Sequence, residues 1–205
     1  MTGDAGIAPD PPSGESLPAS ARRSLLEVAR RSIHHGLSSG EPYCPDPAAY
    51  PAALRVRLAS FVTLKLEGRL RGCIGQLKEE RTLVDGVASN AFGAAFRDRR
   101  FAPVGAGELD RIDIGVSVLS EPQPMRFAGQ AELLAQLCPG RDGLILREGG
   151  RAGTFLPTVW EVLPEPEVFL RELKCKAGLP ADYWSPTLEV SRYSALSFSE
   201  RSAGG

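Results

Sequence analysis

The run Leu70–Gly75, Leu-Arg-Gly-Cys-Ile-Gly, contains the residues of this chain whose types and spacing are best suited to chemistry. A cysteine thiolate is a nucleophile and a metal ligand, and Cys73 lies between Gly72 and Gly75, which leave its backbone open to approach. If the run is a β-strand, alternation places Arg71 on the same face as Cys73, where a guanidinium favours the thiolate. We therefore predict Cys73 as a candidate nucleophile, with Arg71, Gly72 and Gly75 as binding residues around it.

The same run also has a purely structural interpretation. Free cysteine is among the most buried side chains, and Gly-Cys-Ile-Gly is compatible with a β-bulge packed against a helix. Cysteine nucleophiles usually have a base nearby, and only His34 and His35 offer an imidazole in this chain. Nothing in the sequence indicates that either histidine lies near Cys73. Two functional interpretations follow: a binding or adaptor module without chemistry of its own, or a cysteine-dependent enzyme in which Arg71 holds an anionic group.

A second polar cluster is Arg97-Asp98-Arg99-Arg100-Phe101, at the end of a predicted helix. Arginines can hold a phosphate or carboxylate with paired hydrogen bonds, although cations at a helix C-terminus also complement the helix dipole. We keep Asp98 and Arg100 as candidate binding residues.

The cysteines at 44, 73, 138 and 175 are too far apart for a Cys-x-x-Cys pair, and the two histidines are adjacent. Phosphate-binding loops of the P-loop and GxGxxG types are absent as well. We therefore predict neither a metal site nor a cofactor, and we expect the cysteines to be reduced.

Composition narrows the function classes further. The chain has 205 residues with a formal net charge of −1, and 42% of the residues are hydrophobic. This profile predicts a soluble globular protein and argues against a broad nucleic-acid interface, although a local arginine patch is compatible with it. No apolar stretch approaches the roughly 18 residues of a membrane span, and the N-terminus lacks a secretory signal pattern. We expect a cytoplasmic protein that does not bind membranes.

Periodicity and turn residues predict the elements that position these side chains. Helices and hairpins without a regular βαβ rhythm predict an α+β fold with a mostly antiparallel sheet flanked by helices. The low hydrophobicity of residues 1–19 predicts a disordered tail. The expected elements, in chain order, are a helix over 21–35 between Ser20 and Gly36, a hairpin over 61–77 around Glu67-Gly68, a helix over 82–96, a strand over 112–118, a short helix near 130–137, a hairpin over 144–156, a helix over 167–177 and a strand over 188–198.

These residues resemble the signature of the AMMECR family, whose prokaryotic members are called AmmeMemoRadiSam system protein A. The hexapeptide is the most specific part of the match, and ordered matches cover roughly residues 20–200. The matching segments are Phe61–Lys65, Gly68, Leu70–Gly75, Asp98, Arg100-Phe101, Pro103, Glu108-Leu109, Ile114, Ser117–Leu119, Gly140–Leu144, Phe155–Pro157, Val159, Phe169-Leu170 and Lys176–Pro180.

The resemblance implies a larger discontinuous part built from both chain ends, a smaller contiguous part, and a cleft near the hexapeptide. The family-like domain would cover 20–200, with a short tail at 201–205. The resemblance also implies association with a radical SAM protein and a Memo-like protein, without a settled biochemical activity. A homodimer remains open.

Two positions depart from the family pattern. Arg99 occupies a position where proline is typical, which predicts a looser turn. Thr158 occupies a position where glutamine is usual, which removes a polar group from any site that this position lines.

Overall fold

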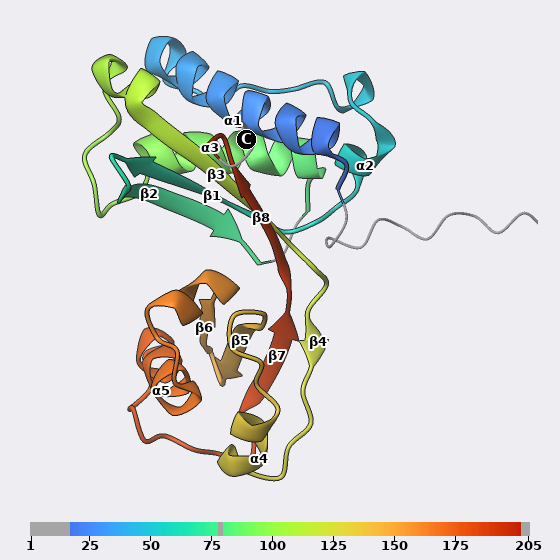
Figure 1. Cartoon of the computed structure of the whole chain (residues 1–205), viewed down its shortest axis with the longest axis vertical. Helices are drawn as coiled ribbons and strands as arrows, with labels where there is room; N and C mark the ends of the chain where they lie inside the picture. The colour runs from blue at the N-terminus through green and yellow to red at the C-terminus, as the bar shows by residue number, and fades with distance from the viewer. Residues whose placement is uncertain (1–16, 78–79, 202–205) are drawn as a thin grey trace, which may run out of the picture.

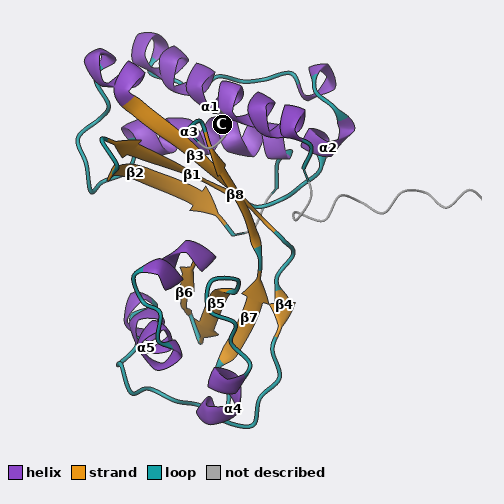
Figure 2. Cartoon of the chain, viewed as in Figure 1, coloured by secondary structure: helices purple, strands orange, loops and turns teal. Residues whose placement is uncertain are grey.

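The computed structural model describes residues 17–77 and 80–201 as two parts, each with its own four-stranded sheet (Figures 1 and 2). The helices are α1 (Ala19–Ser39), α2 (Ala52–Arg55), α3 (Leu83–Phe96), α4 (Gln130–Ala135) and α5 (Pro166–Lys176). The strands are β1 (Ser60–Leu66), β2 (Arg69–Gln76), β3 (Ile112–Leu119), β4 (Gln123–Pro124), β5 (Gly143–Glu148), β6 (Arg151–Phe155), β7 (Glu189–Tyr193) and β8 (Ala195–Ser199). Short 3-10 helices are η1 (Pro47–Ala49), η2 (Ala106–Arg111) and η3 (Pro157–Glu161).

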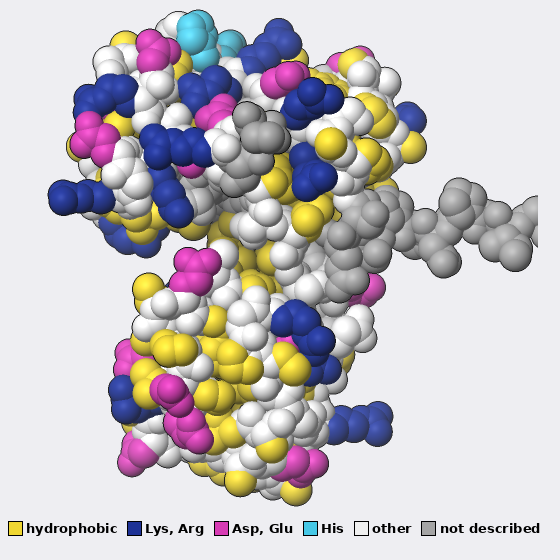
Figure 3. All heavy atoms as spheres, in the orientation of Figure 1, with side chains coloured by type: hydrophobic (Ala, Val, Ile, Leu, Met, Phe, Trp, Pro, Cys, Tyr) yellow, Lys and Arg dark blue, Asp and Glu magenta, His cyan; other side chains and the backbone are white. Residues whose placement is uncertain are grey.

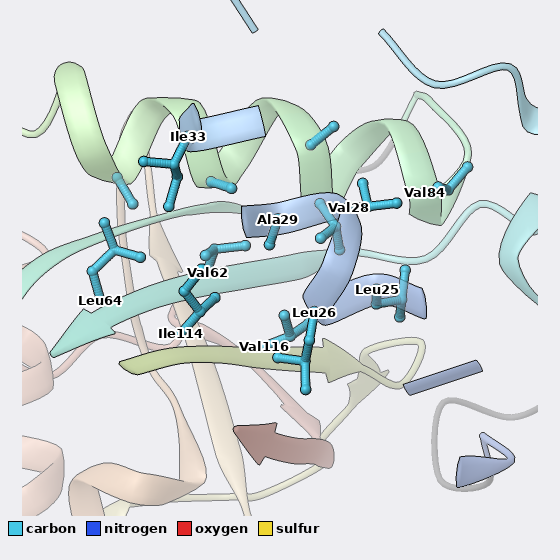
Figure 4. Packing of buried hydrophobic residues seen from close by; sticks show 14 of the residues in the cluster. Leu25, Leu26, Val28, Ala29, Ile33, Val62, Leu64, Val84, Ile114 and Val116 are labelled. Atoms are coloured by element: carbon cyan, nitrogen blue, oxygen red, sulfur yellow. The ribbon is translucent and has the colours of Figure 1, made fainter. Parts of the chain in front are cut away.

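The larger part comes from both ends of the described chain. Its sheet has the order β2-β1-β3-β8, with each neighbouring pair antiparallel. Helix α3 packs on β1 and β2, and α1 packs on α3 and β3. Figure 4 shows apolar side chains from these helices meeting Val62, Leu64, Ile114 and Val116 of the sheet. One face of the sheet is therefore sealed by helices.

The smaller part is contiguous and has the sheet order β4-β7-β5-β6, also antiparallel. Its core includes a stacked pair of rings, Trp160 on Phe169, with centroids 3.8 Å apart. Helix α5 lies against β6, so that Gly153 faces the backbone of Ala177. The predicted α+β fold with a larger discontinuous part and a smaller contiguous part is confirmed.

The two parts meet through a small apolar cluster and two crossings of the chain. Phe61 and Leu77 of the larger part pack with Ile145, Leu156 and Tyr193 of the smaller one. The crossing segments are joined by a hydrogen bond from the Ser120 N–H to the Ser194 carbonyl, at 2.9 Å. Figure 3 shows that the parts are joined at a narrow waist.

The first hairpin forms where the sequence predicts it. Glu67 and Gly68 have φ of 53° and 82°, the two left-handed conformations that a type I′ turn requires. The predicted helix ending at Phe96 is also present, with Thr82 accepting the Asp85 N–H as its N-cap.

Three predicted boundaries are wrong. Ser20 lies inside α1, which begins at Ala19 after Pro18 at the N-cap position. The helix continues past Gly36 to Ser39 and is capped by Gly40, with φ of 74°. A Cβ at Gly36 would lie 2.5 Å from the Phe96 ring, so this glycine permits close helix packing instead of ending the helix. The predicted final strand is two strands, β7 and β8, which belong to different sheets and are separated at Ser194.

Both predicted tails fall largely outside the described residues. Residues 1–16 and 202–205 are not described, whereas Leu17 packs in the core at 5% exposure. Among the described residues, none of the helices has the length and apolar character that a membrane crossing requires.

Candidate functional site

The open face of the larger sheet positions Cys73. Strand pairing aligns Cys73, Thr63, Gly115 and Ser199 in one row across β2, β1, β3 and β8. The alternate residues of these strands point toward α1 and α3, so this row faces away from the helices. Cys73 is half-buried, and its Sγ lies 3.3 Å from the Thr63 hydroxyl.

The two glycines beside Cys73 are explained by close packing. A Cβ at Gly72 would lie 2.1 Å from the Ala94 carbonyl oxygen of α3. A Cβ at Gly75 would lie 2.3 Å from the Phe61 ring on the open face. Their absent side chains let β2 approach the helix on one face and an aromatic ring on the other, so they do not by themselves indicate a ligand.

The Arg71 side chain pairs with Glu108, whereas the sequence predicts that it lies beside the Cys73 thiol. The β1–β2 register shifts between Leu64 and Lys65, and this irregularity leaves Arg71 without a partner in the ladder. Its guanidinium donates to both carboxylate oxygens of Glu108, at 2.8 and 3.0 Å. The pKa of Glu108 is lowered to about 2, mainly because its carboxylate accepts hydrogen bonds from Arg71. The predicted pairing of Arg71 with the thiol assumed an unbroken strand, and the bulge removes that basis.

Asp98 and Arg100 bind the backbone of Cys73. The buried Asp98 carboxylate accepts the Cys73 N–H at 2.9 Å and the Arg100 guanidinium at 2.7 and 2.9 Å. The Arg100 hydrogen bond holds the pKa of Asp98 well below its usual range. Arg100 also donates to the Cys73 carbonyl at 3.3 Å, and its side chain remains 57% exposed. Part of the guanidinium therefore stays accessible beside the cysteine.

Lys176 brings a second cation to Cys73 from the smaller part. It is the last residue of α5, and its Nζ lies 4.9 Å from the centre of the Phe155 ring. Burial lowers the pKa of Lys176, while the charge of a Cys73 thiolate raises it and Arg100 lowers it. The thiol, Arg100 and Lys176 are thus close enough to interact electrostatically. In residues 17–77 and 80–201, no carboxylate forms an ion pair with Lys176.

Sequence reasoning missed the role of Lys176 because its neighbours lie far away in the chain. The only signals in the sequence are its place in the Lys176–Pro180 match and its position at the end of a predicted helix, where a cation complements the helix dipole.

A pocket of about 340 Å³ opens next to Cys73, between the sheet of the larger part and η3 of the smaller one. Its lining begins at Thr63, the neighbour of Cys73, and it includes Thr158, the position that departs from the family pattern. The full lining is Thr63, Lys65, Asp113, Gly115, Val116, Ser117, Leu156, Thr158, Glu161, Ser197, Phe198 and Ser199.

The histidines lie on the opposite side of the sheet from Cys73. His34 and His35 are in α1, the helix that packs over α3, and His35 contacts the Tyr43 ring. Neither one supplies a base to the thiol. Within the described part of the chain, no three His, Cys, Asp or Glu residues cluster closely enough to bind a metal ion.

Comparisons with known proteins agree with this architecture. The sequence model of the AMMECR1 family matches residues 26–198. A protein of Methanothermobacter thermautotrophicus is 38% identical over 87% of this chain and 93% of its own length. A protein of Methanopyrus kandleri is 35% identical over 94% of each chain.

A crystal structure of an uncharacterized protein from Pyrococcus horikoshii has the same fold. Its TM-score to this chain is 0.85 at 33% identity, over 92% of this chain and 96% of the other. The chain is an α+β protein whose two parts face each other across a pocket beside a half-buried cysteine. It belongs to the AMMECR1 family.

Proposed function

We propose that this protein is a ligand-binding module that holds an anionic group, a carboxylate or a phosphate, between Arg100 and Lys176 beside Cys73. The observation that carries the proposal is the convergence of two cations, one from each part, without a carboxylate that pairs with Lys176. A bound anion would compensate the partly desolvated ammonium of Lys176 and use the exposed side of the Arg100 guanidinium. The ligand would then link the two parts.

Titration with simple anions tests this proposal. Inorganic phosphate and acetate are added separately while the amide resonances of Cys73 and Lys176 are followed by NMR. We expect saturable shifts of these resonances. The anion that binds more tightly identifies the anionic group of the ligand as a carboxylate or a phosphate. Lys176→Gln should weaken binding about tenfold, the size of one charge-assisted hydrogen bond. Arg171→Gln, on the exposed face of the same helix, is the matched control and should bind as the parent does. Equal weakening by both variants, or no shift with either anion, contradicts the proposal.

A cysteine-dependent enzyme is the second candidate, and the electrostatic interaction of Cys73 with Arg100 and Lys176 favours it. Here Arg100 and Lys176, instead of Arg71, would hold the anionic group next to the nucleophile. Cys73→Ser separates the candidates, because a binding module keeps its biological activity in this variant. Loss of that activity with unchanged anion binding and partner capture would establish the enzyme.

We also propose that the module works with a radical SAM protein and a Memo-like protein, as the family resemblance implies. Val162, a large apolar residue that is 75% exposed, is the position at which we test this association. Val162 directly follows Glu161, which lines the pocket. Val162→Asp should reduce co-purification with a co-expressed partner, whereas Glu165→Gln, nearby and outside the pocket, should not. Full capture of both partners by Val162→Asp would refute this surface.

A further inference from the structure

Lys174 of α5 is buried in the smaller part without a charged partner. Among the lysines and arginines in residues 17–77 and 80–201, it alone is buried, at 2% exposure. Its Nζ donates to the neutral Gln130 side chain at 2.7 Å and lies 5.6 Å from the centre of the Trp184 ring. No carboxylate of the described chain forms an ion pair with it. Because buried charges in proteins are normally paired, this environment favours the neutral amine.

The amine end of the Lys174 side chain lies beside a pocket of about 280 Å³, which Lys174 helps to line. Gln130, which accepts the hydrogen bond from Nζ, lines the same pocket from the start of α4. Asp182, whose charge acts on the Lys174 ammonium, lines it as well. The nitrogen is therefore within reach of a small molecule bound in this pocket.

Lysine at this position permits chemistry that arginine does not. The chain has 20 arginines and only four lysines, yet the buried cation is a lysine. A guanidinium keeps its proton in proteins, whereas an ammonium group loses its proton readily when it is buried. Burial lowers the pKa of Lys174, and the charge of Asp182 opposes this effect. A neutral lysine amine is a nucleophile that condenses with carbonyl compounds.

We infer that Lys174 is a nucleophilic amine that forms a Schiff base with a small, uncharged aldehyde or ketone in this pocket. The neutral Nζ attacks the carbonyl carbon, so that a C–N bond forms while the electron pair of the C=O π bond moves to oxygen. Both protons of the amine pass to this oxygen, which leaves as water. The products are an imine and water, and the step needs neither an oxidant nor a reductant. The inference is independent of the proposed anion site, since none of its residues is shared.

The charges of the pocket favour an uncharged carbonyl compound. Besides Lys174, the lining contains two acidic residues, Glu167 and Asp182, and one basic residue, Arg171. Arg171 also forms an ion pair with Glu172 at 3.3 Å. With Lys174 neutral, the pocket therefore has an excess of negative charge, which repels an anionic compound. The volume lies just below the roughly 300–1,000 Å³ of typical ligand pockets, so the compound is small.

Reductive trapping of the imine tests this inference on the full chain. Propanal is the uncharged probe, and sodium cyanoborohydride reduces any imine to a stable secondary amine that peptide mass spectrometry locates. Lys65, an exposed lysine of β1, is the reference within the same sample. At pH 7 we expect Lys174 to be modified at least about tenfold faster than Lys65. The ratio of the two rates should fall towards pH 10, because exposed lysines generally lose their protons at about that pH.

Glyoxylate, an anionic aldehyde, tests the class of ligand. Its rate at Lys174, divided by its rate at Lys65 in the same sample, should be lower than the ratio for propanal. Ala181→Phe tests the location, because Ala181 is an exposed residue of the lining. This variant should slow the modification of Lys174 about tenfold and leave that of Lys65 unchanged. Ala135→Phe, at an exposed position of α4 outside the lining, is the matched control and should modify as the parent does.

Four outcomes would overturn the inference. They are modification of Lys174 no faster than that of Lys65, a rate ratio that does not change with pH, a higher ratio with glyoxylate than with propanal, and equal rates at Lys174 in Ala181→Phe and Ala135→Phe. None of these outcomes bears on phosphate or acetate binding at Arg100 and Lys176, so the two proposals fail separately.

Discussion

The Asp98 carboxylate accepts the backbone N–H of Cys73 at 2.9 Å, so a side chain from the turn after α3 occupies the hydrogen-bonding edge of β2. A strand edge normally leaves such groups to water or to another strand. Asp98 and the Arg100 guanidinium together satisfy both the N–H and the carbonyl of Cys73. The position of the cysteine is therefore determined by the loop that follows α3 as well as by the sheet.

Replacement of Asp98 should loosen this edge. Asp98→Ala removes an acceptor that is 8% exposed and leaves the Cys73 N–H without its partner. We expect a loss of about 1–3 kcal/mol in the free energy of unfolding, as measured by urea denaturation. Asp98→Asn keeps one acceptor oxygen and should lose less. If Asp98→Ala is as stable as the parent, the hydrogen bond between Asp98 and the Cys73 N–H contributes nothing to the free energy of unfolding.

The Arg71–Glu108 ion pair predicts an acid-dependent loss of stability. The pKa of Glu108 is lowered to about 2 in the folded protein, below the ordinary value of 4.5. A depressed carboxyl pKa stabilises the folded state above the unfolded value, and this contribution disappears as the pH falls through the folded value. The free energy of unfolding should therefore decrease between about pH 4.5 and about pH 2.

Glu108→Gln should flatten that decrease and cost about 1–2 kcal/mol at neutral pH, measured by urea denaturation across this range. The control is Glu67→Gln, which breaks a surface ion pair with Arg111 and should change stability by less than about 1 kcal/mol. An unchanged pH profile in Glu108→Gln would contradict the prediction.

An added methyl group should destabilise the protein strongly at Gly72 and only slightly at Gly115. In Gly72→Ala the Cβ would lie 2.1 Å from a backbone carbonyl of α3, which cannot move without shifting the helix. We expect a loss of at least about 3 kcal/mol or a failure to fold. Gly115→Ala meets its nearest neighbour at 3.8 Å and should stay within about 1 kcal/mol of the parent. Thermal denaturation of both variants checks the contrast, and equal effects would refute the packing explanation for Gly72.

Local patterns were sufficient to predict the hairpin and α3. Glu67-Gly68 is a turn that two flanking strands require, and Thr82 with Asp85 defines a helix start. Both signals depend on interactions between residues that are close in the sequence, so they do not depend on the tertiary arrangement. The candidate site depends on other information. The bulge that redirects Arg71 changes the register by one residue, and alternation alone does not reveal where it occurs.

Long-range placement accounts for the remaining differences. Lys176 reaches Cys73 only because the smaller part folds back on the larger sheet, and nothing within α5 indicates this. The change of sheet at Ser194 is equally hidden, because β7 and β8 read as one continuous strand. Asp98 and Arg100 were predicted as binding residues, yet their contacts with the Cys73 backbone required the structure.

Lys174 provides the last prediction, which concerns alkaline pH. This lysine is 2% exposed, and its Nζ donates to the Gln130 side-chain oxygen at 2.7 Å. Burial lowers the pKa of Lys174 below its ordinary value, so the unfolded chain binds more protons than the folded one in the pH range between the two values. The free energy of unfolding should therefore rise with pH through that range, because the cost of burying the charge disappears.

Lys174→Met keeps the length of the side chain and removes the charge. We expect a smaller alkaline rise in this variant, because only Lys176, whose pKa burial also lowers, still contributes to it; the free energy of unfolding is measured in urea at a series of pH values up to about 10. Stability at neutral pH should equal or exceed that of the parent, since a buried charge is replaced by an apolar group. Arg171→Gln, three residues earlier on the exposed side of α5, should retain the rise. A variant that loses stability at neutral pH and keeps the alkaline rise would show that the Lys174 ammonium is stabilising.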